Sequence, residues 1–356
     1  MSPSVALQLP FETLGWDEQG LWFLDQTKLP QEQTLFRPQG LPDLIDAIQR
    51  MVVRGAPALG CAAAYGLVYA CTLVQQDEDM SLSLETTKDL AEALWRSRPT
   101  AVNLGVGLKH VILTAKGLPA EHWQKPQAVI EALLSAAKNF HHDDRSRCQA
   151  LGEQGLALLQ DGQRILTHCN AGALATGGIG TALAPIHLAA SRGMKLEVYA
   201  DETRPLRQGA RLTAWEMVQS GIPVHVLPDS AAGSLLASGR IDLVFVGSDR
   251  IAANGDVANK IGTYPLAVLA ARHQVPFYVL APATTVDPAC AEGNLIPIEQ
   301  RSATELLGVD GAKGALAHHP AFDVTPADLV TGIVLEDAIY QPGSEAWAQK
   351  VASLGA

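Results

Sequence analysis

From about residue 160 onward, short β-rich runs alternate with helical segments, and this alternation constrains the fold more than any other feature of the sequence. The runs are RILTHC, KLEVYAD, VHVLPD, IDLVFVGSD, PFYVLAP and DLVTGIVL. Strands that alternate with helices build a mostly parallel sheet covered by helices. We therefore predict an α/β fold for residues 161–356.

The first 125 residues follow a different pattern and predict a smaller domain. Residues 12–25 carry apolar segments on either side of the turn-type DEQG, which indicates a β-hairpin. In LPDLIDAIQRMVVRG the apolar residues recur every three or four positions, as on one face of a helix that ends at Gly55. Further helices are predicted over 84–97, 103–116 and 126–160, the last of which links the domains 1–125 and 161–356.

The composition favours a chain with a large core and argues against nucleic acid as its main ligand. Hydrophobic residues make up 47% of the chain and charged residues 18%, and the net charge is −11 without a cluster of basic residues. The N-terminus shows no charged leader before an apolar run, so no secretory signal is expected. The cysteines form no CxxC pair, which is typical of reduced thiols in a cytosolic protein: Cys61, Cys71, Cys148, Cys169 and Cys290.

One uncharged stretch, Ala56 to Val74, is long enough to cross a bilayer as a helix. It consists mostly of alanine and glycine, whose small side chains contribute little transfer free energy. We expect a tightly packed interior helix, with Pro57 in its first turn, and no membrane association.

Polar residues follow several of the predicted strands. They are His168, Cys169 and Asn170; Asp201, Glu202 and Thr203; Asp229; and Ser248, Asp249 and Arg250. In parallel sheets ligands bind beyond the carboxyl ends of the strands. We therefore expect one pocket that draws on several strand ends.

Cys169 stands where the first of these strands enters the glycine-rich bend NAGALATGGIG. The bend lacks the GK[ST] of a Walker A loop and resembles a dinucleotide fingerprint only loosely, although Asp201 would suit a ribose contact. Two interpretations of Cys169 stay open: a buried small hydrophobe, or a functional thiol beside backbone amides whose positive potential stabilises a thiolate or an anion.

Asp249 ends the run IDLVFVGSD, in which apolar side chains lead to a carboxyl group. Apolar surroundings would raise the pKa of Asp249 and suit it to general acid catalysis. The alternative is a helix N-cap for the next segment.

Two arginines stand beside small residues or proline in a chain with few basic groups. Arg54 precedes Gly55 and Ala56 at a predicted helix start, and Arg98 precedes Pro99. Each alone fits a surface ion pair, but together they indicate an anion site. The HHDD and HHP segments, at 141–144 and 318–320, offer no third metal ligand at a suitable spacing, so we expect solvated loops there.

Several blocks carry a family resemblance that spans nearly the whole chain. They are WFLDQTKLP (22–30), RGAPALG (54–60), SRPTAVNL (97–104), LTHCNAGALATGGIGTAL (166–183), DETRPLRQGARLTAWE (201–216), GSDRIAANGDVANKIGTYPLAVLA (247–270) and PAFDVTP (320–326). In these blocks the chain resembles the methylthioribose-1-phosphate isomerases of methionine salvage, whose superfamily includes regulatory subunits of initiation factor two-B. The resemblance implies a Rossmann-like sheet with flanking helices and a smaller N-terminal domain.

The resemblance also implies roles for particular residues. Cys169 and Asp249 correspond to the family's catalytic pair. The expected phosphate and sugar contacts are Arg54, Gly55, Ala56, Arg98, Gln208, Asn259 and Lys260. The chain departs from the usual family residues at Ile179, Gly105, Val106 and His319, which leaves the group at the sugar's 5-position open.

The implied activity is the conversion of an aldose 1-phosphate to a ketose 1-phosphate, without metal or other cofactor, by a cytoplasmic homodimer. Two alternatives within the same scaffold are an isomerase of 5-deoxyribose 1-phosphate or ribose 1,5-bisphosphate, and a non-catalytic subunit like those of the initiation factor. An NAD-dependent dehydrogenase is a third alternative, based on the glycine-rich bend alone.

Overall fold

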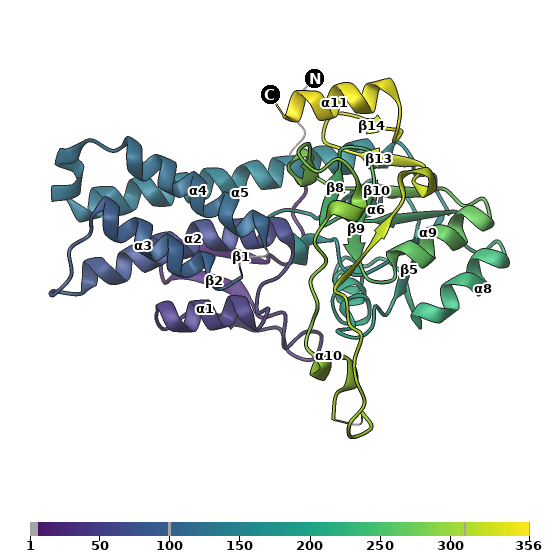
Figure 1. The fold of residues 1–356 in the computed structure, drawn as a ribbon, viewed down its shortest axis with the longest axis horizontal. Helices are drawn as coiled ribbons and strands as arrows, with labels where there is room; N and C mark the ends of the chain where they lie inside the picture. The colour runs from purple at the N-terminus through teal and green to yellow at the C-terminus, as the bar shows by residue number, and fades with distance from the viewer. Residues whose placement is uncertain (1–5, 99–100, 310, 356) are drawn as a thin grey trace. The chain divides into compact units, whose positions relative to one another are not determined.

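The computed structural model describes residues 6–98, 101–309 and 311–355. The chain forms two compact units, whose elements are labelled in Figure 1. Unit 1 comprises residues 1–10, 147–172 and 179–356, and unit 2 comprises residues 11–146 and 173–178. The helix predicted to link the two domains therefore contributes residues to both units.

Unit 2 contains the predicted hairpin and the predicted helices. Its strands β1 (Leu14–Asp17), β2 (Gly20–Leu24) and β3 (Leu35–Phe36) form an antiparallel sheet in that order. Its helical elements are α1 (Leu41–Gln49), α2 (Ala56–Gln76), α3 (Leu84–Trp95), α4 (Val102–Gly117), η1 (Ala120–Gln124), η2 (Ala173–Ala175) and the first part of α5 (Pro126–Leu156).

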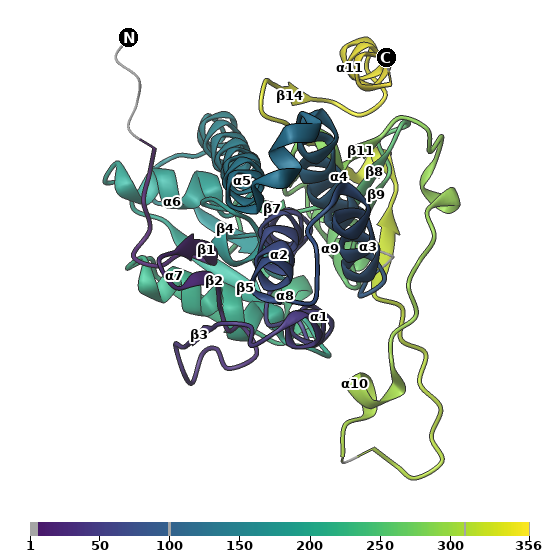
Figure 2. The same cartoon turned by 90° about the vertical axis from the view of Figure 1, so that its left-hand side faces the viewer.

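The alanine-rich helix α2 is the centre of unit 2, as predicted. It packs against α1, α3, α4 and the β1–β2 hairpin (Figure 2). The backbones of α2 and α4 approach so closely that a Cβ atom at Gly107 would lie only 2.0 Å from the carbonyl oxygen of Gly60. Glycine at position 107 therefore permits this contact. Among the described residues α2 is the one helix long and apolar enough to cross a membrane, and 78% of its most apolar window is buried inside the protein. Small side chains thus serve close helix packing here.

The main sheet of unit 1 confirms the six strands predicted from the alternating pattern. It runs in the order β14-β13-β10-β7-β4-β5-β6, and all neighbours are parallel except β13 and β14. The strands are β4 (Arg164–Thr167), β5 (Glu197–Asp201), β6 (Val224–Leu227), β7 (Leu243–Val246), β10 (Phe277–Leu280), β13 (Gly332–Val334) and β14 (Ile339–Tyr340).

Two hydrophobic clusters cover the two faces of this sheet. Leu166 and Val244 belong to one cluster, whereas their chain neighbours Ile165 and Leu243 belong to the other. Both faces are buried because side chains alternate along a strand and helices supply apolar partners on each side. The helical elements of unit 1 are the end of α5, α6 (Ala184–Ser191), η3 (Gly209–Thr213), α7 (Ala214–Gln219), η4 (Asp229–Ala231), α8 (Ala232–Ala237), α9 (Thr263–Arg272), η5 (Ala283–Thr285), η6 (Gly293–Leu295), α10 (Ala303–Leu307), η7 (Ala327–Leu329) and α11 (Glu345–Leu354).

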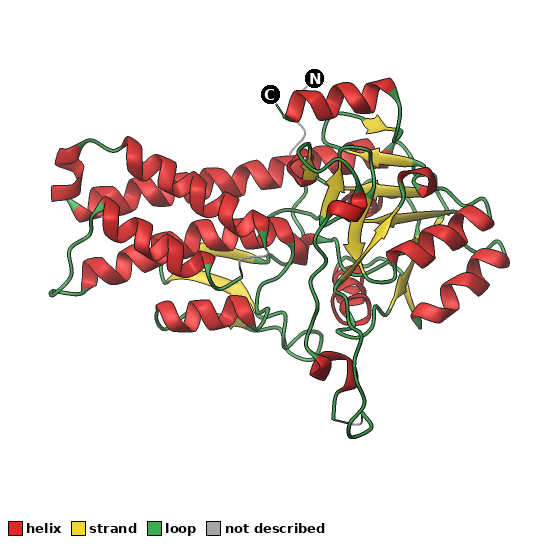
Figure 3. Ribbon diagram, viewed as in Figure 1, coloured by secondary structure: helices red, strands yellow, loops and turns green. Residues whose placement is uncertain are grey.

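A second sheet in unit 1 was not predicted. Its order is β11-β8-β9-β12, with strands β8 (Arg250–Ala252), β9 (Val257–Lys260), β11 (Val286–Asp287) and β12 (Phe322–Thr325), drawn in yellow in Figure 3. These strands are as short as those of the main sheet, but polar residues interrupt them (RIA, VANK, VD and FDVT), so they form no apolar run that would mark them in the sequence. The sheet carries Asn259 and Lys260, two of the expected substrate contacts, in β9.

Candidate functional site

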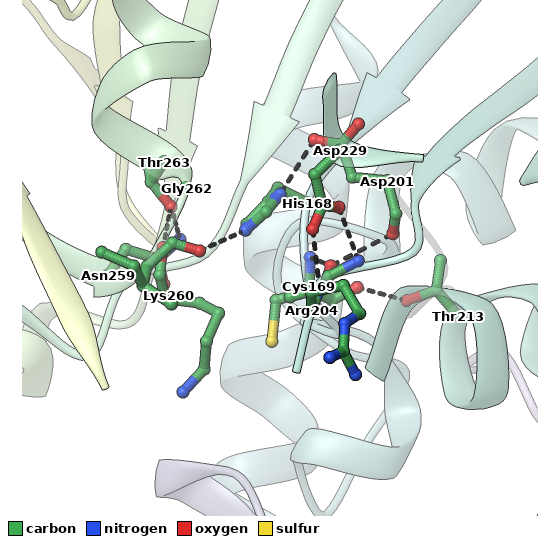
Figure 4. Close-up of polar contacts among 12 residues, drawn as sticks. His168, Cys169, Asp201, Arg204, Thr213, Asp229, Asn259, Lys260, Gly262 and Thr263 are labelled. Atoms are coloured by element: carbon green, nitrogen blue, oxygen red, sulfur yellow. Dashed lines mark hydrogen bonds and ion pairs between the residues drawn. The ribbon is translucent and has the colours of Figure 1, made fainter. Parts of the chain in front are cut away.

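The carboxyl ends of three neighbouring strands converge, as predicted. His168 follows β4, Asp201 ends β5 and Asp229 follows β6, and their nitrogen and carboxylate oxygen atoms lie within 4.8 Å of one another (Figure 4). This spacing would suit a metal ion, but the groups are engaged in hydrogen bonds. The Asp229 carboxylate accepts from the backbone N–H groups of Thr203 and Arg204, each at 2.7 Å.

His168 connects the main sheet to the loop after β9. Its Nδ1 lies 2.8 Å from Asp201 Oδ2, and its Nε2 lies 2.8 Å from the carbonyl oxygen of Ile261. Because a carbonyl can only accept, Nε2 carries a proton. Gly262 leaves room for the ring, since a Cβ atom there would lie 2.7 Å from His168 Cε1.

The His168–Asp201 pair is buried, and the pKa values of both groups are raised. Burial opposes the positive charge of His168, but the hydrogen bond and charge of Asp201 outweigh it and raise the pKa of His168 above its ordinary value of 6.5. Burial also raises the pKa of Asp201, against the effect of His168. The two shifts have one meaning, which is that the folded pair holds a proton more firmly than the separate groups would.

Cys169 follows His168 and is 9% exposed. Its φ angle of 65° lies in the left-handed region, which is uncommon for a residue with a side chain. Its N–H donates to Thr203 Oγ1 at 2.8 Å, and its carbonyl accepts from Thr213 Oγ1 at 2.6 Å. In the view of Figure 4 the thiol extends away from the His168–Asp201 pair, on the side toward which the Lys260 side chain also extends.

Nearby residues of unit 1 hold the two predicted substrate contacts in β9. Asn259 is buried, and its Nδ2 donates to Thr263 Oγ1 at 3.0 Å. Lys260 Nζ donates to the carbonyl of Ala321 at 3.0 Å and lies 4.6 Å from the centre of the Phe322 ring. This cation–π contact places a positive charge at the edge of the second sheet.

Gln208, a further predicted contact, is buried at the start of the π-helix η3. A Cβ atom at Gly209 would lie 1.7 Å from the carbonyl oxygen of Asp201, so only glycine lets this element approach β5 so closely. Single π-helical turns often occur at functional sites.

Asp249 differs from both interpretations drawn from the sequence. It is exposed, so the expected enclosure by apolar side chains is wrong. The next residues form the strand β8, so the helix-capping alternative is also wrong. The apolar residues of β7 end at Val246, and the chain turns outward into the second sheet, where the Asp249 N–H donates to the carbonyl of Ala258 at 3.0 Å.

The remaining predicted contacts lie in unit 2. Arg54, Gly55 and Ala56 are half-buried at the start of α2, where Gly55 has a φ angle of 96° and offers no side-chain cap. The first N–H groups of such a helix attract an anion. Arg98 is half-buried after α3, and Pro99 and Thr100 of the same motif lie outside the described residues.

Both histidine pairs differ from the solvated loops that were expected. The HHDD segment lies inside α5, where buried His141 contacts Tyr65 Oη at 3.1 Å and the carbonyl of Gly177 at 2.8 Å. Asp144 accepts from the Gly177 N–H at 2.7 Å. His319 of the HHP segment is also buried, with Nδ1 3.3 Å from the carbonyl of Ser302.

The sequence alone gave no indication of the groups that hold Cys169. Thr203 was noted only as polar and near a strand end, and Thr213 and Glu216 were not singled out. Asn170 Nδ2 donates to Glu216 Oε1 at 2.9 Å, and both residues are buried. Hydrogen bonds between residues so far apart in the chain leave no periodic pattern in the sequence.

Comparison with known proteins places the chain in a family. The sequence model of the initiation factor 2 subunit family matches residues 52–342. The methylthioribose-1-phosphate isomerase of Gemmatimonas aurantiaca is 49% identical over 96% of both chains, and that of a Roseiflexus species is 45% identical over 93% of this chain and 95% of its own.

Two solved structures are similar over nearly the whole chain. The 5-methylthioribose 1-phosphate isomerase of Pyrococcus horikoshii has a TM-score of 0.86 and 35% identity, covering 98% of this chain and 96% of that one. A translation initiation factor eIF-2B delta subunit from A. fulgidus has a TM-score of 0.85 and 38% identity, covering 96% and 99%. The chain therefore belongs to the initiation factor 2 subunit family and, within it, to the methylthioribose-1-phosphate isomerases.

Proposed function

We propose that this protein is an aldose-ketose isomerase that converts 5-methylthioribose 1-phosphate to 5-methylthioribulose 1-phosphate. The relatives with this name match over more than nine-tenths of the chain. The observation that carries the proposal is the setting of Cys169, a thiol at the carboxyl end of β4 with its backbone held on both sides. Ligands of parallel sheets bind at this edge.

The chemistry requires the enzyme to open the sugar ring. The anomeric oxygen is a phosphate ester, so the sugar cannot open spontaneously to a free aldehyde. We assign Asp249 as the general acid that donates a proton to the ring oxygen. Asp249 is exposed, and a substrate that covers it would exclude water from the carboxyl group, which favours the protonated form that this role requires.

We assign Cys169 to the transfer between C2 and C1. It either moves the C2 proton through an enolate-type intermediate or stabilises the transition state of a hydride shift. Reaction in deuterated water separates the routes, because deuterium at C1 of the product supports proton transfer. Complete absence of deuterium favours the hydride shift, unless the same proton is returned internally.

The phosphate is assigned to Arg54, Arg98 and the backbone amides of Gly55 and Ala56. Guanidinium groups bind phosphate through paired hydrogen bonds, and the N-terminus of α2 adds favourable backbone dipoles. Gln208, Asn259 and Lys260 are assigned to the sugar and its phosphate, where Lys260 adds one positive charge.

The decisive experiment follows ketose formation by the purified protein with 5-methylthioribose 1-phosphate. Parallel reactions with 5-deoxyribose 1-phosphate and ribose 1,5-bisphosphate determine the preference at the 5-position. The expected result is turnover that is fastest with the methylthio substrate and lost in Cys169→Ala. Turnover that is equal in the wild-type protein and in Cys169→Ala and Asp249→Asn would refute the site assignment.

A non-catalytic role is the second candidate, because one of the similar structures is an initiation factor subunit. The presence of both Cys169 and Asp249 favours the enzyme, since a purely regulatory subunit requires neither a thiol nor an acid at these positions. A protein that binds the sugar phosphate without converting it would support the regulatory alternative. We further propose that the enzyme is a cytoplasmic homodimer, for which light scattering after gel filtration gives the mass.

A further inference from the structure

The backbone of Cys169 adopts a conformation that it would not hold unaided. Its φ angle is 65°, in the left-handed region that a Cβ atom makes unfavourable. Such a conformation persists only where the surroundings enforce it. The groups that enforce it here therefore determine where the thiol points.

Two buried threonine hydroxyls bind the two sides of this residue. Thr203 Oγ1 accepts from the Cys169 N–H at 2.8 Å, and Thr213 Oγ1 donates to the Cys169 carbonyl at 2.6 Å. Both threonines are completely buried. We propose that Thr203 and Thr213 are positioning residues of the isomerase, which fix the Cys169 thiol toward the reacting carbons by clamping its backbone.

The hydroxyl of Thr203 is itself oriented by its neighbours. It lies 3.1 Å from the carbonyl oxygen of Asp201, to which it donates, so its lone pair is available to the Cys169 N–H. Thr203 also has a left-handed φ angle of 63°, and its N–H donates to Asp229 Oδ1 at 2.7 Å. A β-branched residue in this conformation is a rare outlier, which indicates that the hydroxyl position is needed.

The hydroxyl of Thr213, which binds the carbonyl of Cys169, is held by the side chain of Asn170. Asn170 Nδ2 lies 3.3 Å from Thr213 Oγ1 and 2.9 Å from Glu216 Oε1, so the amide braces both. Glu216 is fully buried, and its Oε2 lies 3.6 Å from His187 Nε2. Asn170, the residue after Cys169, is therefore bonded both to Thr213 at the end of η3 and to Glu216 in α7.

The position of Thr213 depends on the π-helical turn. Thr213 ends η3 (Gly209–Thr213), and Gln208 stands at the start of the same element. A π-turn contains one residue more than the corresponding α-turn, so it changes the register of the side chains that follow. One element thereby sets both a proposed sugar contact and the clamp on the thiol.

A merely structural role would make these threonines important for folding alone. The two roles are separable because valine has nearly the shape of threonine without the hydroxyl, whereas serine keeps the hydroxyl. Thr87 supplies a matched control, since it is also fully buried and its Oγ1 donates to the carbonyl of Ser83 at 2.7 Å in α3.

The test compares Thr213→Val, Thr213→Ser and Thr87→Val in steady-state kinetics. A displacement of about 1 Å costs up to about a hundredfold in rate, so we expect kcat of Thr213→Val to fall about ten- to a hundredfold with KM changed less than about threefold. Thr213→Ser should restore kcat to within about threefold, and Thr87→Val should leave both constants near wild type. Thr203→Val and Thr203→Ser give the same comparison if Thr213→Val does not fold.

Alkylation of Cys169 by iodoacetamide, followed by peptide mass spectrometry, gives a second readout that does not depend on turnover. The rate for Cys169 should change in Thr213→Val and return in Thr213→Ser. Equal kcat in Thr213→Val and Thr87→Val, with an unchanged alkylation rate, overturns the clamp. The clamp proposal rests on the proposed function only for the identity of the reaction. An inactive wild-type protein would therefore count against the proposed function. In that case the alkylation rates alone would decide whether the two threonines position Cys169.

Discussion

His168 Nδ1 and Asp201 Oδ2 are 2.8 Å apart in the interior of unit 1, at the carboxyl ends of two adjacent parallel strands. His168 stands directly before Cys169 in the chain and, through the Ile261 carbonyl, holds the loop that follows Lys260. A single ion pair thus supports two parts of the proposed site. Its proton also makes the stability of unit 1 depend on pH.

We expect the stability to fall as the pH rises above the ordinary histidine range. The pKa of His168 is raised in the folded protein, so its contribution is fully present below its unfolded value of 6.5 and is lost as the pH rises through the folded pKa. Urea unfolding between about pH 6 and about pH 9 measures this. Asp201→Asn should show a weaker dependence in that range, and equal slopes in the two proteins would contradict the assignment.

Loss of either proposed catalytic group should remove turnover without unfolding the protein. Removing a positioned acid or base costs about a hundred- to ten-thousandfold in rate, which we expect for Asp249→Asn and Cys169→Ala. Cys290→Ser is the matched control, because Cys290 is a free, half-buried thiol in another part of unit 1. Circular dichroism and initial rates test the prediction, which would be refuted if Cys290→Ser lost as much activity as Cys169→Ala.

Gly55→Ala should destabilise unit 2 more than backbone strain alone explains. A Cβ atom at Gly55 would lie 2.4 Å from Ala175 Cα, whereas one at Gly20 would meet nothing within 4 Å. The two glycines have similar φ angles, 96° and 93°. We expect a loss of about 1–3 kcal/mol for Gly20→Ala and more than about 3 kcal/mol for Gly55→Ala.

Urea denaturation of these two variants measures both losses, and the difference between them isolates the steric clash at the start of α2. Equal losses would show that Ala175 yields to the added methyl group.

Asp323→Ala should weaken substrate binding through the loop that follows β9. The Asp323 carboxylate accepts from the N–H groups of Gly262 at 2.7 Å and Tyr264 at 3.1 Å. Two lost hydrogen bonds to a charged acceptor cost about 3–6 kcal/mol at most, and the loop that directly follows Asn259 and Lys260 of β9 should loosen. We therefore expect KM to rise more than kcat falls.

Asp77→Ala is the control for this variant, because the exposed Asp77 carboxylate accepts a local hydrogen bond from the Asp79 N–H, two residues along the chain. If Asp323→Ala lowered kcat alone, the loop would not hold the substrate contacts.

The sequence predicted the architecture well because the periodic signals were long and clear. The six parallel strands and the interior helix α2 follow directly from apolar runs and small residues. The second sheet was missed because polar residues interrupt its short strands, whereas the equally short strands of the main sheet lie in apolar runs. Its absence from the prediction also explains the error at Asp249, whose apolar run ends before the chain turns into β8.

The chemistry of the site was only partly predictable. Polar residues at strand ends indicated where His168, Cys169 and Asp201 would meet. The left-handed backbone of Cys169 and its two threonine partners were not predictable, since Thr203 and Thr213 lie 34 and 44 residues away in sequence. Only the folded chain brings those two hydroxyls to the N–H and the carbonyl of the same residue, Cys169.

The short segment 173–178 belongs to unit 2, although the chain on both sides of it belongs to unit 1. Its carbonyls accept from Thr13 Oγ1 and Gln26 Nε2, at 2.6 Å and 2.7 Å. A gene fragment that encodes residues 11–146 alone would omit the two carbonyls and lose both of these hydrogen bonds. Unit 2 is therefore built from two separate stretches of the chain, and a fragment that ends at residue 146 is not the whole unit.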